Sequence, residues 1–404
     1  MARKFGSLAR SVIAHALLSV LPVASLFGLA ELAAWAGGTQ PLAETEAFQA
    51  LEFVRDCPAT EPLIDAVCDP ERLGRGDGRS SVYVLGGSSV QGYPKDVTPF
   101  PTYLGHLLEQ QLPGAYRVHN LGQACRDSTY VRKCSERIQG APGDLYVIYS
   151  GHNDFMNYMV PNPRLRMASV EYPRVFALES VFAKSHLYSW LFGLVAGSPE
   201  KPEPTGERER LSEHQWQYAR ELTLEHYAGN LTHVIEQARA LGVEVVLGTL
   251  LSNVSEFPHR RDVWDARLAS SGERTTWDRP YEQGIELLRA GRAPDALAAF
   301  RTAKDQNLWG RAPTQLNQWI RRIAESDPNV RLADLEVDLR EFWGPDRHGC
   351  DLFGGEDWCD QFHPNERLSQ WIARRLGAEI LRLHRSGAMR WPTRGPARAG
   401  RRGE

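Results

Sequence analysis

The feature that most constrains the fold of this 404-residue chain is a series of short, strongly apolar runs separated by longer amphipathic segments. Helical periodicity lies between the runs, as at Tyr103–Leu112 and Tyr218–Leu241. Apolar strands that alternate with helices predict a parallel sheet covered on both faces. We therefore expect an α/β protein, a three-layer α/β/α sandwich on a five-stranded parallel sheet. The expected strands are Ser81–Leu85, Arg117–Leu121, Leu145–Tyr149, Val243–Leu250 and, more weakly, Val330–Leu335.

Small and polar residues cluster where three of these strands end, and again before the last amphipathic helix. The carboxyl ends of parallel strands share one edge of the sheet, and ligands bind there. Each cluster alone is compatible with a helix cap, a turn or a surface loop, but four of them in this order indicate one site. They are Gly86-Gly87-Ser88-Ser89-Val90-Gln91-Gly92, Asn120-Leu121-Gly122, Gly151-His152-Asn153-Asp154 and Asp360-Gln361-Phe362-His363.

Three residues in these clusters fit the roles of a catalytic triad. A serine hydroxyl such as that of Ser88 is a poor nucleophile until an imidazole accepts its proton, and His363 can be this base. Asp360 can bind the other ring nitrogen and fix its tautomer. This set predicts acyl transfer through a covalent acyl-enzyme.

Acyl transfer also develops a negative charge on the carbonyl oxygen, so hydrogen-bond donors are needed beside the nucleophile. The backbone N–H groups of Ser88 and Gly122 and the side-chain amide of Asn153 are the candidate donors. A well-placed donor contributes roughly 3 kcal/mol to transition-state stabilisation. A glycine at position 122 allows close approach of the backbone.

The four clusters resemble the sequence blocks of the SGNH (GDSL-type) hydrolase superfamily, over about Ser81 to Leu383. The family's Gly-Asp-Ser-Leu block is similar to Gly86–Ser89 and its second-block glycine to Gly122. Its Gly-x-Asn-Asp block is similar to Gly151–Asp154 and its Asp-x-x-His block to residues 360–363. The resemblance implies a flavodoxin-like SGNH hydrolase fold and ester hydrolysis without a metal or organic cofactor.

The resemblance also favours Ser88 over Ser89 as the nucleophile, because Ser88 takes the family's serine position. Three departures affect the substrate class more than the chemistry. Gly87 replaces the family's aspartate, Ser89 replaces leucine, and Cys125 stands where a second glycine is common. The first block is not the Gly-x-Ser-x-Gly elbow of α/β-hydrolases, which argues against that fold.

The N-terminal residues predict export. Arg3, Lys4 and Arg10 precede Ser11–Ala30, which carries no charged residue and is long enough to cross a bilayer of roughly 30 Å as a helix. The next basic residue is Arg55, so the positive charges favour a cytoplasmic N-terminus. We expect a retained single-pass anchor in the inner membrane, with the catalytic domain on the periplasmic side. A signal peptide cleaved after Ala34-Trp35-Ala36 is the alternative, and a buried soluble helix fits less well.

The six cysteines agree with an oxidising compartment, because they form three close pairs in the sequence. Six cysteines allow 15 connectivities, of which we expect the nearest-neighbour one. Free buried thiols are the alternative. A zinc site that includes His348 and His363 is less favoured, because the cysteine spacing is wide. The expected pairs are Cys57 with Cys68, Cys125 with Cys134, and Cys350 with Cys359.

The expected domain spans residues 81–390 and follows an anchor (1–37) and an N-terminal segment (38–80). Two insertions interrupt it. The insertion at 155–210 is an active-site lid, an acyl-chain pocket, a plain helical hairpin or a membrane-surface element. The insertion at 256–324 has tetratricopeptide-like spacing of Gly284, Gly291, Ala296, Phe300 and Ala303, which predicts a helical hairpin over 277–307 that could contact a protein partner.

Residues 391–404 are rich in Arg, Gly and Pro, which predicts a disordered tail.

Composition narrows the function further. A chain that is 42% hydrophobic and 24% charged is neither disordered nor a polytopic membrane protein. A net charge of −3 gives no basic field for nucleic acid. We expect an extracytoplasmic serine esterase acting on a small acyl ester or an acylated glycan. The first alternative is an O-acyltransferase of cell-surface polysaccharide with the same site, and the second is a non-catalytic scaffold that uses the helical insertion.

Overall fold

A computed structural model describes fourteen parts of the chain, which form two compact units. The sheet unit comprises Ala59–Arg164 and Glu213–Glu404, and the N-terminal unit comprises Met1–Pro58 and Leu165–Ser212. The described residues are 26–39, 41, 61–69, 73, 78–94, 97–158, 167, 182, 184–196, 213–254, 278–306, 311–343, 358 and 362–387.

The centre of the sheet unit is a five-stranded parallel sheet with the order β2-β1-β3-β4-β5. This confirms the expected parallel sheet. Val82 of β1 pairs with Val118 of β2 on one side and with Leu145 of β3 on the other. The strands are β1 (Ser80–Gly86), β2 (Tyr116–Asn120), β3 (Leu145–Tyr149), β4 (Glu244–Gly248) and β5 (Val330–Ala333).

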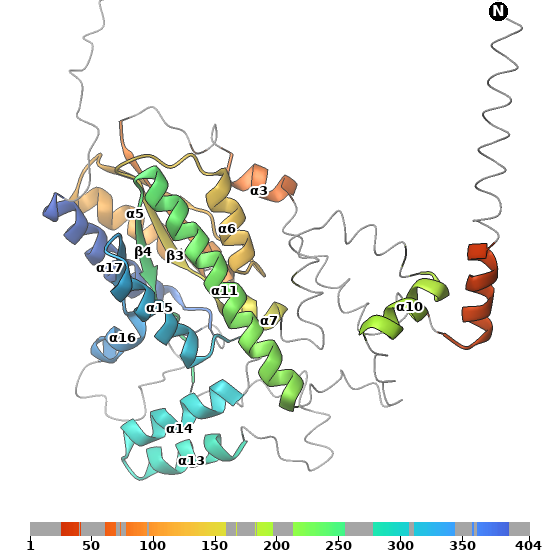
Figure 1. The fold of residues 1–404 in the computed structure, drawn as a ribbon. Helices are drawn as coiled ribbons and strands as arrows, with labels where there is room; N and C mark the ends of the chain where they lie inside the picture. The colour runs from red at the N-terminus through yellow and green to blue at the C-terminus, as the bar shows by residue number, and fades with distance from the viewer. Residues whose placement is uncertain are drawn as a thin grey trace, which may run out of the picture. The chain divides into compact units, whose positions relative to one another are not determined.

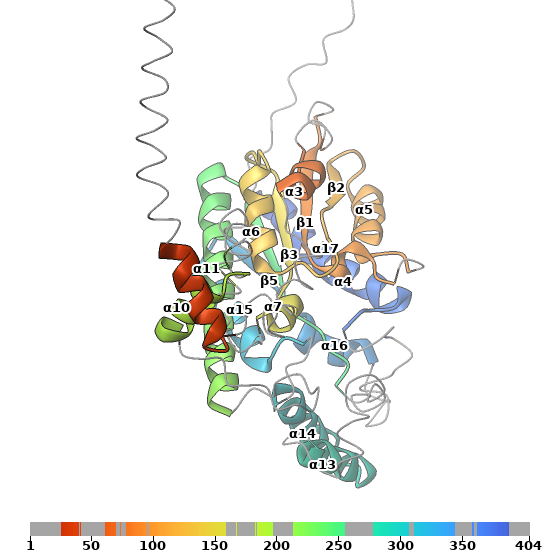
Figure 2. The same ribbon diagram turned by 90° about the vertical axis from the view of Figure 1, so that its right-hand side faces the viewer.

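Helices cover both faces of the sheet, as expected for a three-layer sandwich (Figures 1 and 2). Helices α5 (Phe100–Gln111) and α17 (Glu366–Ser386) pack together on one face. The opposite face carries α6 (Ser128–Arg137), α11 (Glu213–Leu241) and α15 (Thr314–Ser326).

The core lies on both sides of the inner strands, which explains their apolar sequences. Every residue of β1 and β3 is buried, whereas β2, at the edge, is half-buried. Tyr83 meets Tyr146 edge to face, with ring centroids 5.9 Å apart. Burial of apolar surface stabilises the fold by roughly 25 cal/mol per Å², so these two buried strands are a stable support for the residues that follow them.

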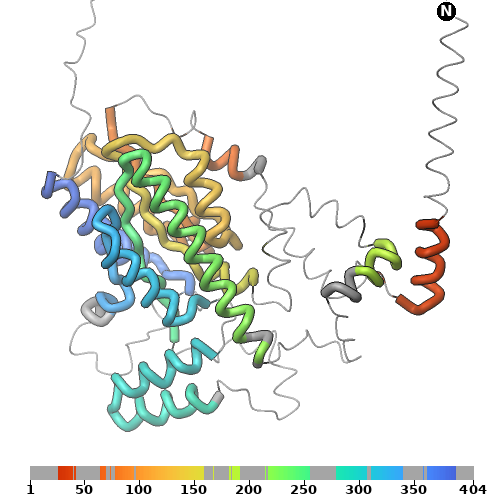
Figure 3. Tube along the Cα trace, in the orientation of Figure 1, coloured from red at the N-terminus to blue at the C-terminus, as the bar shows by residue number. Residues whose placement is uncertain are grey.

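The second insertion contains two helices, α13 (Asp278–Arg289) and α14 (Ala293–Gln306), which pack against each other (Figure 3). A Cβ atom at Gly284 would lie 2.6 Å from Cε1 of Phe300, so the missing side chain permits the close packing. The pair has a small core of its own, which includes Tyr281, Ala296 and Phe300. Its assignment to the tetratricopeptide class stays a prediction.

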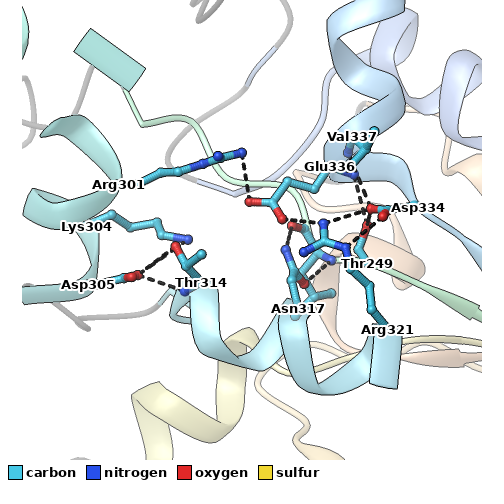
Figure 4. Close-up of polar contacts among 11 residues, drawn as sticks. Thr249, Arg301, Lys304, Asp305, Thr314, Asn317, Arg321, Asp334, Glu336 and Val337 are labelled. Carbon is cyan, nitrogen blue, oxygen red and sulfur yellow. Dashed lines mark hydrogen bonds and ion pairs between the residues drawn. The ribbon is translucent and has the colours of Figure 1, made fainter. Parts of the chain in front are cut away.

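A network of charged side chains joins α14 to the ends of β4 and β5 (Figure 4). Glu336, on α16 (Leu335–Trp343), binds Arg301 of α14 at 3.2 Å and Arg321 of α15 at 2.7 Å. Arg321 also donates to Asp334 at 2.7 Å, and the hydroxyl of Thr249 donates to the same carboxylate at 3.1 Å. Because these side chains are largely buried, the network attaches the helical pair firmly to the sheet.

The cysteines differ from the nearest-neighbour pairing. Helix α3 (Glu61–Val67) packs against α6, and this contact brings Sγ of Cys68 to 2.7 Å from Sγ of Cys134. The expected disulfide between Cys125 and Cys134 is not formed in this structure, because tertiary packing places Cys134 against Cys68 instead. No disulfide joins the three cysteines that are described. Cys57, Cys350 and Cys359 lie outside the described residues.

The N-terminal unit has two described helices, one at 26–36 and α10 (His186–Ala196). Most of the expected anchor, Ser11–Ala30, lies outside the described residues, as does the tail at 391–404. Within the parts of the chain that are described, no helix combines the length and the apolar character needed to span a bilayer.

Candidate active site

The candidate site lies at the carboxyl ends of β1 and β3. These strands are neighbours, and the connections that leave them lead to opposite sides of the sheet order. Such a switch point opens a crevice where ligands bind. Gly87 and the short helix α4 (Ser88–Gln91) follow β1, and Gly151 and α7 (His152–Asn157) follow β3.

Ser88 and His363 are in direct contact. Oγ of Ser88 lies 2.7 Å from Nε2 of His363, and both residues are more than nine-tenths buried. At this distance the hydroxyl can donate to an unprotonated Nε2, which is the contact that a serine nucleophile needs. His363 is positioned by the start of α17, where the side chain of Asn365 accepts the N–H of Leu368 at 3.0 Å.

The neighbouring serine has a different partner. Oγ of Ser89 donates to the backbone carbonyl of Phe362 at 3.2 Å. Ser89 therefore tethers the loop that carries His363, while Ser88 faces the imidazole. Of the two candidate nucleophiles, Ser88 has the contact with the base.

Two aromatic rings flank the imidazole of His363. The Tyr93 ring lies 4.7 Å away and the Phe362 ring 4.4 Å away, between centroids. Sequence reasoning missed Tyr93, although it directly follows the first block. The predicted third triad member, Asp360, lies outside the described residues, so its role stays a prediction.

Asn153 has a fixed amide orientation. Its Nδ2 donates to the carbonyl of Arg126 at 2.7 Å, which leaves the second N–H of this group for another acceptor. A Cβ atom at Gly87 would lie 2.5 Å from Nδ2. Gly87 therefore leaves space beside the Nδ2 group of Asn153. This space is next to the backbone N–H of Ser88, the first N–H of α4. Intrahelical bonds do not use the first N–H groups of a helix.

Gly122, the third predicted oxyanion donor, differs from expectation. Its N–H donates to Oδ1 of Asn120 at 2.9 Å, so this donor is already occupied. The lack of a side chain serves packing instead, because a Cβ atom here would lie 2.3 Å from the backbone nitrogen of Gln91. Asn120 in turn donates to the carbonyl of Val90 at 2.9 Å and so fixes α4 to the end of β2.

Cys125 occupies a backbone conformation that favours glycine. Its φ angle is +60°, in the left-handed region that residues with a side chain rarely adopt. This is the position at which the resemblance leads one to expect a glycine. The turn directs the next carbonyl, that of Arg126, toward Asn153.

His152 is buried and uncharged. Its Nδ1 accepts the backbone N–H of Ala312 at 3.1 Å, and its ring stacks on Phe362. Burial, together with the charges of Lys304 and His363, lowers the pKa of His152 to about 3. His152 is thus a neutral support behind the loop that carries His363 rather than an exposed group.

Asp154 stabilises the loops beside the candidate site. Its carboxylate accepts the backbone N–H of Ser128 at 3.1 Å and also the hydroxyl of Ser128. Burial and the nearby charge of Asp127 raise the pKa of Asp154. Asp127 caps α6 through the N–H of Thr129 at 3.0 Å. These contacts hold the start of α7, and with it Asn153, against the neighbouring loop.

His348, Cys350 and Cys359, the other members of the alternative zinc set, lie outside the described residues. Within the described segments, no group of three or more His, Cys, Asp or Glu side chains is arranged to hold a metal ion.

Comparison with known proteins gives distant likenesses only. No family model matches the sequence, and no curated protein is significantly similar to it. Solved structures that are similar include a member of the lipolytic protein G-D-S-L family from Veillonella parvula DSM 2008, at 12% identity and a TM-score of 0.35, covering 75% of this chain and 97% of that one.

Two further structures match over comparable lengths. A GDSL-like lipase from Bacteroides thetaiotaomicron VPI-5482 is 11% identical with a TM-score of 0.35, covering 79% of this chain and 99% of that one. The acetyl xylan esterase AlAXEase is 12% identical with a TM-score of 0.36, covering 74% and 99%. TM-scores of 0.35–0.36 carry no argument about activity.

Proposed function

We propose that the sheet unit is a serine esterase that hydrolyses carboxylic esters through an acyl-enzyme at Ser88. The observation that carries the proposal is the distance of 2.7 Å between Oγ of Ser88 and Nε2 of His363, in a site where Ser89 is bound elsewhere. The chemistry of this pair is activation of a hydroxyl by a neutral imidazole.

In the first half of the reaction, Oγ of Ser88 attacks the ester carbonyl carbon while Nε2 of His363 takes the hydroxyl proton. The charge that develops on the carbonyl oxygen is met by the N–H of Ser88 and by the second N–H of Asn153. Collapse of the tetrahedral intermediate breaks the ester C–O bond, and His363 returns the proton to the leaving alcohol.

In the second half, water attacks the acyl carbon and gives a proton to His363. Collapse of this second intermediate breaks the bond between the acyl carbon and Oγ of Ser88, His363 returns its proton to Oγ, and the carboxylic acid is released. Asp360, three residues before the base, would orient the imidazole and stabilise its charged form. The donor set supplies two hydrogen bonds to the oxyanion, because the N–H of Gly122 is held by Asn120.

Labelling of the purified chain with a fluorophosphonate tests this proposal. We expect the wild type and Ser89→Ala to be labelled, and Ser88→Ala to lose the label completely. His363→Ala should label at least 100-fold more slowly, since it keeps the hydroxyl but loses its base. Labelling that persists in Ser88→Ala, in protein with an unchanged melting temperature, would contradict the assignment of the nucleophile.

Product analysis tests whether water or a sugar hydroxyl accepts the acyl group. Hydrolysis of p-nitrophenyl acetate should release acetate and not transfer it to added oligosaccharide. Transfer of the acetyl group to a sugar hydroxyl with little free acetate would contradict the esterase proposal and support an O-acyltransferase. A folded chain that neither reacts with the fluorophosphonate nor hydrolyses the ester would support the non-catalytic scaffold.

We further propose that the sheet unit lies on the periplasmic side of the inner membrane. The proposal rests on Arg3, Lys4 and Arg10 preceding the uncharged residues Ser11–Ala30. Protease added to spheroplasts should digest the sheet unit without lysis. Resistance until the cells are lysed would contradict this topology.

A further inference from the structure

The N-terminal unit joins two segments that are far apart in the sequence. The side chain of Glu31, on helix 26–36, accepts the backbone N–H groups of His186 at 2.6 Å and Leu187 at 2.8 Å, at the start of α10. It also accepts the hydroxyl of Ser185 at 2.6 Å. Figures 1 and 2 both show α10 beside this helix, which is drawn in red.

Glu31 is the only Asp, Glu, Lys or Arg residue between Ser11 and Ala43. A carboxylate in such an apolar segment needs compensation, and the first N–H groups of α10 and the partial positive charge of its N-terminus supply it. Although burial raises the pKa of Glu31, the hydrogen bonds from Ser185, Leu187 and His186 lower it to about 2. The carboxylate is therefore ionised and bound at neutral pH.

The two helices expose large apolar side chains. On helix 26–36, the exposed fractions are 57–67% for five residues: Leu26, Phe27, Leu29, Leu32 and Trp35. On α10, Trp190 and Leu191 are 48% and 47% exposed. The sequence of α10, HLYSWLFGLVA, contains no Asp, Glu, Lys or Arg. An apolar surface without interspersed charges marks an interaction site.

We propose that this apolar surface of helix 26–36 and α10, the lipid-binding pair, contacts a bilayer, with residues 26–30 at the end of the expected span and the rest of the pair in the interfacial region. A bilayer is the partner that fits this surface, because helix 26–36 continues residues 11–25, which carry no charged residue and belong to the expected span. Tryptophan is enriched where a membrane meets water, and each helix exposes one. Because neither helix carries a basic face, the binding rests on apolar area rather than on anionic lipid.

Lipid contact through α10 is a role of the first insertion that does not depend on the esterase activity. Since α10 belongs to that insertion and Glu31 to the expected anchor at residues 1–37, the chain meets the bilayer at two points in its sequence. The carboxylate of Glu31 connects them, so its loss should release α10 without removing residues 11–25.

Photo-crosslinking tests this placement in the full chain. The variant Leu191→p-benzoylphenylalanine places a photoreactive group on α10, and Val337→p-benzoylphenylalanine is the matched control on the sheet unit, with a similar exposure of 48%. Both are irradiated with vesicles of phosphatidylethanolamine and phosphatidylglycerol that contain an alkyne-tagged phosphatidylcholine. We expect at least tenfold more phospholipid adduct at position 191 than at 337.

A second variant distinguishes the lipid contact of α10 from membrane binding by residues 11–25. Adding Glu31→Ala should lower the adduct at position 191 at least fivefold while the protein still floats with the vesicles. Equal adduct at 191 and 337, or crosslinks from 191 to a second protein chain instead of lipid, would overturn the proposal. An unchanged adduct in Glu31→Ala would overturn the role of Glu31. Fluorophosphonate labelling of the same samples reports the esterase site independently.

Discussion

The imidazole of His152 stacks on the ring of Phe362, with centroids 5.1 Å apart and planes at 25° to each other. This contact connects the block that follows β3 with the block that carries His363. Asn153 and His363, the proposed oxyanion donor and base, are each one residue away from the stack. The buried, neutral His152 thus helps to fix the relative position of these two groups.

The first prediction concerns acid stability. Since the pKa of His152 is about 3 in the folded chain and near 6.5 when unfolded, only the unfolded state binds a proton between these values. The free energy of unfolding should fall as the pH drops below 6.5, by at most about 1.4 kcal/mol per pH unit from this group. Urea unfolding of His152→Gln should give a shallower pH dependence than the wild type. Parallel curves for the two proteins would contradict a neutral His152.

The second prediction separates two amides on α7. Asn153→Ala should lower kcat by about 10²–10³ with little change in KM, because it removes an oxyanion donor. Asn157 lies one turn later and its Nδ2 donates to Asp127 at 2.8 Å. Asn157→Ala should therefore lower the melting temperature more than kcat. The assay is ester hydrolysis under saturating substrate, and equal losses of kcat in both variants would argue against a specific role of Asn153.

The third prediction concerns the buried thiols. Oxidised glutathione should convert Cys68 and Cys134 into a disulfide by thiol–disulfide exchange, and is itself reduced to two glutathione thiols. The crosslink closes a loop between residues 66 positions apart and should stabilise the fold by about 2–4 kcal/mol. Peptide mapping should find this bond in Cys125→Gly but not in Cys68→Ala. A bond between Cys125 and Cys134 would instead support the pairing of nearest neighbours.

The fourth prediction compares two helical glycines. A Cβ atom at Gly284 would clash with Phe300, so Gly284→Ala should destabilise the α13–α14 pair by about 1–3 kcal/mol. At Gly229 on α11, no heavy atom outside the adjoining backbone of its own helix lies within 4 Å of the added Cβ. Gly229→Ala should therefore stabilise the chain by up to about 1 kcal/mol through helix propensity. Thermal unfolding measures the stability of both variants. A loss of stability in both would show that the space around the added Cβ does not decide the effect of the substitution.

The fifth prediction concerns the charged network. Burial alone would raise the pKa of Glu336, but Arg301, Lys304 and Arg321 lower it. The stability that it contributes should be present above about pH 4.3, its pKa when unfolded, and be lost as the pH falls through the lower folded value. Glu336→Gln should cost about 2 kcal/mol at pH 7 and become neutral in strong acid. Chemical unfolding at pH 7 and pH 3 gives the comparison.

Much of the sheet could be predicted because strand burial leaves a direct pattern in the sequence. Leu145–Tyr149 was expected as a strand and is β3, and the expected strand at Val243–Leu250 shortens to β4 at Glu244–Gly248. Helix α11 begins at Glu213, five residues before the expected start at Tyr218. Four of these first five residues are polar and Trp216 stands alone among them, so they give no apolar periodicity that marks the boundary.

The details of the site were less predictable, because they depend on contacts between distant segments. Motif spacing indicated Ser88 and His363, yet it could not show that Asn120 binds the N–H of Gly122. The neighbour of Cys134 depends on how α3 packs on α6. His152 accepts the backbone N–H of Ala312, which lies 160 residues away in the sequence.

The span of 275 residues between Ser88 and His363 has a consequence for biosynthesis. Ser88, the proposed nucleophile, is synthesised early, whereas His363, its proposed base, follows β5 and is placed by the packing of α17 on α5. A nascent chain that has completed four strands therefore carries the serine without a proton acceptor. Assembly of the Ser88–His363 pair reports that the last helix has docked, so reactivity toward a fluorophosphonate would measure the completion of folding itself.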